Sequence, residues 1–169
     1  MPTSPVKSRF VAALCGALLC ALTAAAALKT GDPAPDLAAF NLEGKLPEGL
    51  KDKVVLLDFW ASWCDPCRDS FPVMDALQKQ YGPRGFVIIA VNVDEKKADM
   101  EEFLKKNPVT FNVVRDAKQK LVEKAGIATM PTSILIDRTG KVRFVHSGFR
   151  GVETRRKYES EIESLLGKP

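Results

Sequence analysis

The sequence has few of the side chains that build a permanent metal site or a disulfide scaffold. Of its 169 residues, four are cysteine and one is histidine, His146. Cys15 and Cys20 lie in an apolar N-terminal run, so the body of the chain carries only Cys64 and Cys67. A structural zinc site needs four ligands. The body of a single chain therefore cannot supply four cysteines, or two cysteines and two histidines. His146 is expected to be an exposed strand residue rather than a metal ligand.

The chain also lacks a strong excess of charge. Its net charge is +4, and Lys7 and Arg9 near the start contribute two of those charges. No basic stripe interleaved with aromatic residues appears, so we expect no nucleic-acid partner. The densest basic cluster, residues 155–157, is typical of a solvated helix face. With 46% hydrophobic residues and no internal repeat, the chain is expected to form one globular domain.

The N-terminus has the pattern of a targeting segment. Lys7 and Arg9 precede an uncharged run over residues 10–28, in which the alanines at 24–27 offer several cleavage positions. We expect residues 1–27 to be a signal peptide or an uncleaved membrane anchor, with a tether through residues 10–28 in the second case. Residues 28–169 would then form the functional domain, in the periplasm or otherwise outside the cytoplasm.

Hydrophobic periodicity predicts alternating strands and helices. Residues 54–60 and 86–93 are apolar runs typical of strands buried on both faces. Between them a helical stripe consists of Phe71, Met74, Leu77 and Tyr81. Further elements are predicted as a helix ending before Pro108, a strand at 111–116, a helix at 117–126, strands at 133–137 and 141–147, and a last helix bearing Tyr158, Ile162, Leu165 and Leu166. This order predicts an α/β fold with a mixed sheet.

Cys64 and Cys67 lie where the first buried strand gives way to a helix. Pro66 suits the first helical turn, where no N–H is required. Free amides and the helix dipole favour an anion at that position, so Cys64 is expected to be the thiolate nucleophile and Cys67 the resolving thiol. A pair three residues apart closes too small a loop to stabilise a fold of this size. Binding of a soft ion such as Cu(I) by the two thiolates stays open.

Two segments resemble those of a known family. DFWASWCDPC, residues 58–67, is similar to the thioredoxin active-site segment, and ATMPTSILID, residues 128–137, is similar to its cis-proline loop. An extra helix and strand at about 94–116, the GDPAPD segment and the export signal resemble the TlpA/ResA/DsbE-like oxidoreductases. The resemblance covers roughly residues 31–166. It implies a thioredoxin-like fold, a central mixed sheet flanked by helices, with an inserted helix–strand element and an N-terminal extension.

The resemblance also implies roles for single residues. Pro131 would face the disulfide through a cis peptide bond, leaving the backbone of Met130 free to pair with a substrate strand. Asp58 would be a buried carboxyl near Cys67 that moves its proton, with a pKa raised by its apolar surroundings. Trp63 would pack beside the disulfide.

The dipeptide between the cysteines departs from the Gly-Pro of general thioredoxins. Here it is Asp65-Pro66. The negative charge of Asp65 is expected to disfavour the Cys64 thiolate and to stabilise the disulfide relative to the dithiol. The protein would then be a stronger reductant than oxidant.

The implied activity is that of an exported protein-disulfide reductase without a cofactor. Its substrates would be cysteines of apocytochrome c or of copper-centre assembly proteins, and a membrane electron donor of the thiol–disulfide interchange type would reduce it again. The alternatives are a copper-binding chaperone that uses the same two cysteines and a thiol peroxidase, because GDPAPD-like segments also occur in peroxiredoxins. A pure interaction module is disfavoured by the intact cysteine pair.

Overall fold

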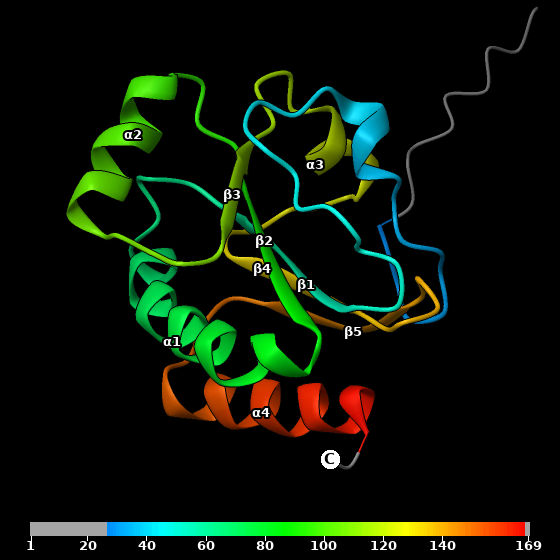
Figure 1. Cartoon of the computed structure of the whole chain (residues 1–169). Helices are drawn as coiled ribbons and strands as arrows, with labels where there is room; N and C mark the ends of the chain where they lie inside the picture. The colour runs from blue at the N-terminus through cyan, green and yellow to red at the C-terminus, as the bar shows by residue number, and fades with distance from the viewer. Residues whose placement is uncertain (1–26, 168–169) are drawn as a thin grey trace, which may run out of the picture.

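A five-stranded mixed sheet forms the centre of the computed structural model, which describes residues 27–167 (Figure 1). Its strand order is β3-β2-β1-β4-β5. The first three strands are parallel, whereas β4 is antiparallel to β1 and β5 to β4. The bounds are β1 Val54–Trp60, β2 Phe86–Asn92, β3 Asn112–Arg115, β4 Thr132–Ile136 and β5 Val142–Ser147. The predicted α/β fold and mixed sheet are confirmed.

The central strands are buried as their composition predicts. Every residue of β1 is buried, and in β2 all but Val87 are. Continuous apolar runs of this kind are typical of strands that are covered on both faces. The active-site segment therefore follows directly from the most deeply buried strand of the sheet.

Within residues 27–167, four helices and two short 3-10 helices surround the sheet. They are η1 Leu37–Phe40, α1 Asp65–Tyr81, η2 Gly82–Arg84, α2 Lys97–Lys106, α3 Lys120–Lys124 and α4 Val152–Leu166. Helices α1 and α4 lie together on one face, and α3 and η1 lie on the other (Figure 1). The hydroxyl of Tyr81 on α1 donates to Glu163 on α4 at 2.9 Å, which joins the two helices of the first layer.

Helix α3 is shorter than the predicted helix at 117–126. The carboxylate of Asp116 accepts hydrogen bonds from the amides of Lys120, Leu121 and Val122 at 2.8–3.1 Å. These bonds satisfy the free amides of a helix start, so the helix begins only at Lys120. Gly126, with φ at +65°, follows its end as predicted.

The prediction that His146 is an exposed strand residue is wrong. The residue lies on β5, but its side chain is only 18% exposed because α4 packs over it. Its Nε2 lies 2.6 Å from a carboxylate oxygen of Glu161. The basic cluster at 155–157 is exposed on α4, as expected.

The N-terminal extension bonds to both outer strands of the sheet. The backbones of Glu43 and Arg115 exchange two hydrogen bonds at the free edge of β3, at 2.9 and 2.8 Å. At the free edge of β5, the backbone of Val142 bonds to Gly31 and Asp32. The extension therefore occupies part of each edge of the sheet.

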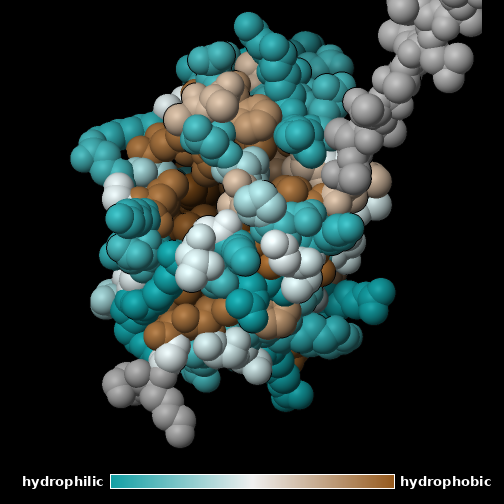
Figure 2. Space-filling view, turned by 90° about the vertical axis from the view of Figure 1, so that its right-hand side faces the viewer, coloured by the Kyte–Doolittle hydropathy of each residue, from teal (hydrophilic) through white to brown (hydrophobic). Residues whose placement is uncertain are grey.

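A hydrophobic hollow lies on the side of the molecule that carries this extension. Figure 2 shows hydrophobic residues gathered in a hollow on that face. A cavity of about 510 Å³ lies there between the extension, the loop before β1 and the β4–β5 turn. Its apolar lining includes Leu37, Leu46, Leu50 and Ile136.

No helix within residues 27–167 combines the length and the apolar character needed to cross a membrane. The export signal or anchor expected over residues 1–27 lies, apart from its last residue, outside the described part of the chain.

Candidate active site

The two cysteines form a disulfide at the start of α1. Their sulfurs are 2.07 Å apart, and their Cα atoms are 5.3 Å apart. Cys64 is the N-cap residue, in an extended conformation, and Pro66 lies in the first turn, as predicted. The sulfur of Cys64 accepts a hydrogen bond from the backbone N–H of Cys67 at 3.2 Å. The same N–H would stabilise a thiolate on Cys64 once the disulfide is reduced.

The two cysteine residues differ slightly in their exposure to solvent. Cys64 is 4% exposed, whereas Cys67 is completely buried. The indole of Trp63, directly before Cys64, is 70% exposed and is the most exposed large hydrophobic side chain in the described chain. Trp60, in contrast, is completely buried and belongs to the core, as expected. Of the two cysteines, Cys64 is therefore the one with some exposed surface, and it lies beside Trp63 in the chain.

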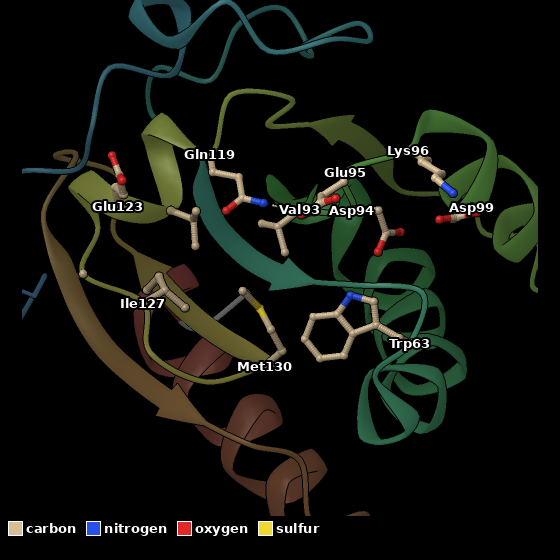
Figure 3. Close-up of a pocket in the computed structure, with 12 residues that line it drawn as sticks. Trp63, Val93, Asp94, Glu95, Lys96, Asp99, Gln119, Glu123, Ile127 and Met130 are labelled. Carbon is tan, nitrogen blue, oxygen red and sulfur yellow. Dashed lines mark hydrogen bonds between the residues drawn. The ribbon is translucent and has the colours of Figure 1, made fainter.

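The loop that carries Pro131 meets the same end of the sheet. The Met130–Pro131 peptide bond is cis. Phe59 of β1 pairs with Thr132 of β4, so Pro131 lies beside the last residues of β1, from which the chain runs to Cys64. Met130 and Trp63 line one pocket and lie near each other in it (Figure 3). The structure thus brings the two segments that resemble thioredoxin to one site.

Asp58 is completely buried in the centre of β1. The hydroxyl of Ser133 donates to its Oδ1 at 2.5 Å, and Oδ2 has no hydrogen-bond partner among residues 27–167. Burial raises the pKa of Asp58 to about 7, and the hydrogen bond from Ser133 lowers it in part. The expected raised pKa is confirmed, and it places the titration of this carboxyl near neutral pH.

The alternation of side chains along β1 shows which layer Asp58 faces. Residues two apart in a strand point to the same face. Asp58 therefore faces the same way as Trp60, whose ring packs against Phe71 of α1 with 4.7 Å between centroids. Cys67 is buried in the first turn of the same helix. The carboxyl thus points into the layer that holds the buried sulfur.

A pocket of about 750 Å³ opens beside Trp63 and Met130 (Figure 3). Its apolar side includes Ile127, and its acidic side includes Glu95 and Asp99 from the loop and helix that follow β2. The inserted element predicted at about 94–116 therefore contributes a wall of the site. These acidic residues carry no local signal in the sequence, because only the fold shows that this element reaches the pocket.

Arg115 holds the loop that carries the pocket acids. Its guanidinium donates to the backbone carbonyls of Asp94 and Glu95 at 3.0 Å each, and to the carboxylate of Glu43 at 3.0 and 3.2 Å. The carboxylate of Asp94 in turn accepts from the backbone N–H of Ser62, in the turn before the cysteines. The pocket wall and the active-site turn are thereby connected.

Asp65 points into solvent next to the disulfide. Its carboxylate lies 2.9 Å from Arg68, and the two side chains are 82% and 50% exposed, respectively. An ion pair this exposed is worth little. Arg68 therefore offsets only a small part of the negative charge that Asp65 brings to the helix start.

Within residues 27–167 no group of three or more His, Cys, Asp or Glu side chains is arranged to hold a metal ion. A metal bound at Cys64 and Cys67 would have to use those two sulfurs in their reduced form.

Comparison with known proteins identifies the family. A family model described as Redoxin matches residues 29–166. The thiol-disulfide oxidoreductase ResA of Geobacillus thermodenitrificans is 34% identical over 141 residues, which cover 82% of this chain and 79% of that protein. ResA of Bacillus subtilis is 37% identical over 123 residues, covering 72% and 69%.

Solved structures show the same relationship. A crystal structure described as a thiol:disulfide interchange protein DsbE from Chlorobium tepidum has a TM-score of 0.77 and 44% sequence identity, and the match covers 83% of this chain and 100% of that one. The chain therefore belongs to the Redoxin family, as a ResA/DsbE-like thiol–disulfide oxidoreductase of the thioredoxin superfamily with Cys64 and Cys67 as its C-x-x-C pair.

Proposed function

We propose that the protein is an exported reductase of protein disulfides, with Cys64 as the nucleophile and Cys67 as the resolving thiol. The observation that carries this assignment is the position of the Cys64 sulfur, which caps α1 and accepts the Cys67 N–H, while Cys67 itself is buried. The outer sulfur is thus the one that is both reachable and stabilised as an anion.

The reaction transfers two electrons in two exchange steps. The thiolate of Cys64 attacks one sulfur of a substrate disulfide, forming a mixed disulfide and releasing one substrate thiolate. The thiolate of Cys67 then attacks the Cys64 sulfur, which forms the Cys64–Cys67 disulfide and releases the second substrate thiolate. A dithiol donor must reduce this disulfide before the next cycle.

Asp58 has the properties needed to take the proton of Cys67. Its carboxyl is buried in the layer of α1, and its pKa of about 7 lets it both accept and release a proton at neutral pH. Trp63, Met130, Asp65 and Pro66 would contact the substrate polypeptide, and the cis-proline loop of Pro131 would align it.

The resemblance to the TlpA/ResA/DsbE-like group favours cysteines of apocytochrome c or of copper-centre assembly proteins as substrates. It also favours a membrane electron donor of the thiol–disulfide interchange type. In this proposal residues 1–27 are the export signal or membrane anchor, and the domain works outside the cytoplasm, in the periplasm or an equivalent compartment.

Trapping of mixed disulfides tests the proposal. Cys67→Ala should accumulate substrate proteins linked to Cys64, because the resolving thiol is absent, and the matched variant Cys64→Ala should trap none. Mass spectrometry would identify the trapped chains. Failure of Cys67→Ala to trap any protein, together with failure of the reduced wild type to reduce insulin, would refute the reductase.

The same protein preparations test the alternatives. Tight stoichiometric binding of Cu(I) by reduced protein that cannot reduce insulin would favour the copper chaperone. Turnover of hydrogen peroxide would favour the thiol peroxidase.

A further inference from the structure

A buried chain of hydrogen bonds connects Asp58 to the C-terminal helix. The hydroxyl of Tyr158 on α4 donates to Ser133 Oγ at 2.8 Å, and Ser133 on β4 donates to Asp58 Oδ1 on β1 at 2.5 Å. All three residues are buried, with at most 1% exposure. No step proposed above uses Ser133 or Tyr158.

We propose that Ser133 and Tyr158 are positioning residues, which hold Oδ1 of Asp58 in this chain so that the unpartnered Oδ2 is the oxygen that takes the proton of Cys67. The inference rests on the proposed reductase function and adds to it the groups that control the proton acceptor.

The direction of the chain follows from its donors. A hydroxyl has one proton to donate. Ser133 donates its hydroxyl proton to the carboxylate of Asp58. It accepts a hydrogen bond from the hydroxyl of Tyr158. Oδ1 thereby accepts the Ser133 proton, whereas Oδ2 is buried without a hydrogen-bond partner in the described chain and keeps all its lone-pair sites free. A hydrogen bond to an ionised carboxylate is stronger than one between neutral groups, so the chain favours the ionised form of Asp58.

In the part of the chain that the structure describes, no basic side chain is paired with Asp58 to stabilise its ionised form. In the sheet, Asp58 lies opposite Ala90 of β2 on one side and Ser133 of β4 on the other. Ser133 in turn lies opposite His146 of β5. His146 bonds to Glu161 of α4, and its ring packs edge-on against that of Tyr158 with 5.3 Å between centroids. The titratable groups on this side are thus Tyr158 and Glu161 from α4, His146 from β5 and Cys67 from α1. Within residues 27–167, no ion pair joins Asp58 to a basic side chain.

Burial alone would therefore leave Asp58 protonated at neutral pH, and the hydrogen bond from Ser133 opposes this. Tyr158 supports that bond by donating to Ser133. In the mixed disulfide, the S–H bond of Cys67 breaks as an O–H bond forms on Oδ2, and the thiolate attacks the Cys64 sulfur. If the hydroxyls are removed, Asp58 holds its own proton to higher pH and cannot accept a second one. The resolving step should then require higher pH.

Carboxyl ¹³C NMR titration of the oxidised full chain tests the positioning directly, because neither cysteine titrates in the disulfide. We expect the midpoint of Asp58 to rise by about one pH unit in Ser133→Ala, and by less in Tyr158→Phe, because a hydrogen bond to the charged form is lost or weakened. Ser133→Thr restores a hydroxyl and should restore the wild-type midpoint.

Tyr81→Phe is the matched control. It removes a tyrosine hydroxyl that joins α1 to α4 through Glu163 in the same layer, without contact to Asp58. It should leave the midpoint unchanged. Because Tyr158→Phe removes a single oxygen atom, it keeps the test available if Ser133→Ala does not fold.

The rate of the resolving step, measured against pH with reduced protein, completes the test. A profile displaced toward higher pH together with the NMR midpoint supports the proposal. An unchanged midpoint in Ser133→Ala and Tyr158→Phe overturns the positioning role while leaving the reductase intact. A displaced midpoint with an unchanged rate profile overturns the transfer of the Cys67 proton to Asp58. Loss of insulin reduction by the wild type would instead refute the reductase itself.

Discussion

The backbone amide of Cys67 lies 3.2 Å from the sulfur of Cys64 and donates to it across the first turn of α1. This contact couples the two cysteines beyond their disulfide. In the proposed cycle, the Cys64 sulfur keeps this donor when the disulfide opens, whereas the buried sulfur of Cys67 has to lose its proton in an apolar layer. Charges close to the sulfur of Cys64 should therefore change the reduction potential. Proton acceptors close to the sulfur of Cys67 should instead change the pH dependence of the resolving step.

Neutralising Asp65 should make the protein a weaker reductant. Asp65→Asn removes a negative charge next to the Cys64 thiolate, so the reduced form gains stability and the reduction potential rises, by roughly 10–20 mV for an exposed charge. Arg68→Gln should change the potential in the opposite direction, because it leaves Asp65 without its partner at 2.9 Å. Redox titration against glutathione measures both variants, and a lower or unchanged potential in Asp65→Asn would contradict the assigned role of the charge.

Asp58 should make stability depend on pH near neutrality. Its pKa is raised from 3.8 to about 7 in the folded state, so between these values the folded protein binds more protons than the unfolded chain. The free energy of unfolding should therefore fall as pH rises through this window, by about 2–4 kcal/mol. Urea unfolding of the oxidised wild type and Asp58→Asn at several pH values measures the difference between them. Parallel curves for the two proteins would show that Asp58 does not titrate as assigned.

Asp137 in the β4–β5 turn should make the free energy of unfolding depend on pH with the opposite sign. Burial raises its pKa, but hydrogen bonds from Thr139, the Lys141 amide and Arg143 outweigh burial and hold the pKa at about 2. The stability that this carboxylate contributes is present above pH 3.8 and is lost as pH falls toward 2. Asp137→Asn should cost about 1–2 kcal/mol at pH 7 and little at pH 2, which thermal unfolding at the two pH values would reveal.

Trp63 should contribute to the binding of protein substrates. Trp63→Ala removes an exposed aromatic surface beside Cys64, and we expect a roughly tenfold lower kcat/KM for a protein disulfide. The rate with a small disulfide should hardly change, because such a molecule does not cover the indole. Val152→Ala is the control, since Val152 is 66% exposed on α4. Equal losses with both kinds of substrate would assign Trp63 to the chemistry rather than to binding.

The elements with strong local signals could be predicted from the sequence. The uninterrupted apolar run at 54–60 predicted β1, and Pro66 with the stripe from Phe71 to Tyr81 predicted α1, so the position of Cys64 at a helix start followed. The contribution of Ser133 could not be predicted, because it depends on the register of β4 against β1, which no local pattern specifies.

The surroundings of His146 were wrongly predicted for a related reason. The prediction rested on a lone histidine in a strand being more often exposed than a ligand, and only the packing of α4 shows that Glu161 covers it. Tyr158 was correctly placed on the buried face of the last helix, whereas its bond to Ser133 joins residues 25 positions apart and had no signal in the sequence.

The bonds of the N-terminal extension to the free edges of β3 and β5 have a consequence for association between copies of the chain. An open strand edge presents unpaired amides and carbonyls on which another polypeptide can add a strand. Glu43 on one side and the segment at Gly31 and Asp32 on the other satisfy part of these groups within the same molecule. The N-terminal extension therefore leaves fewer free backbone groups at both sheet edges for strand addition by another chain, which should disfavour aggregation.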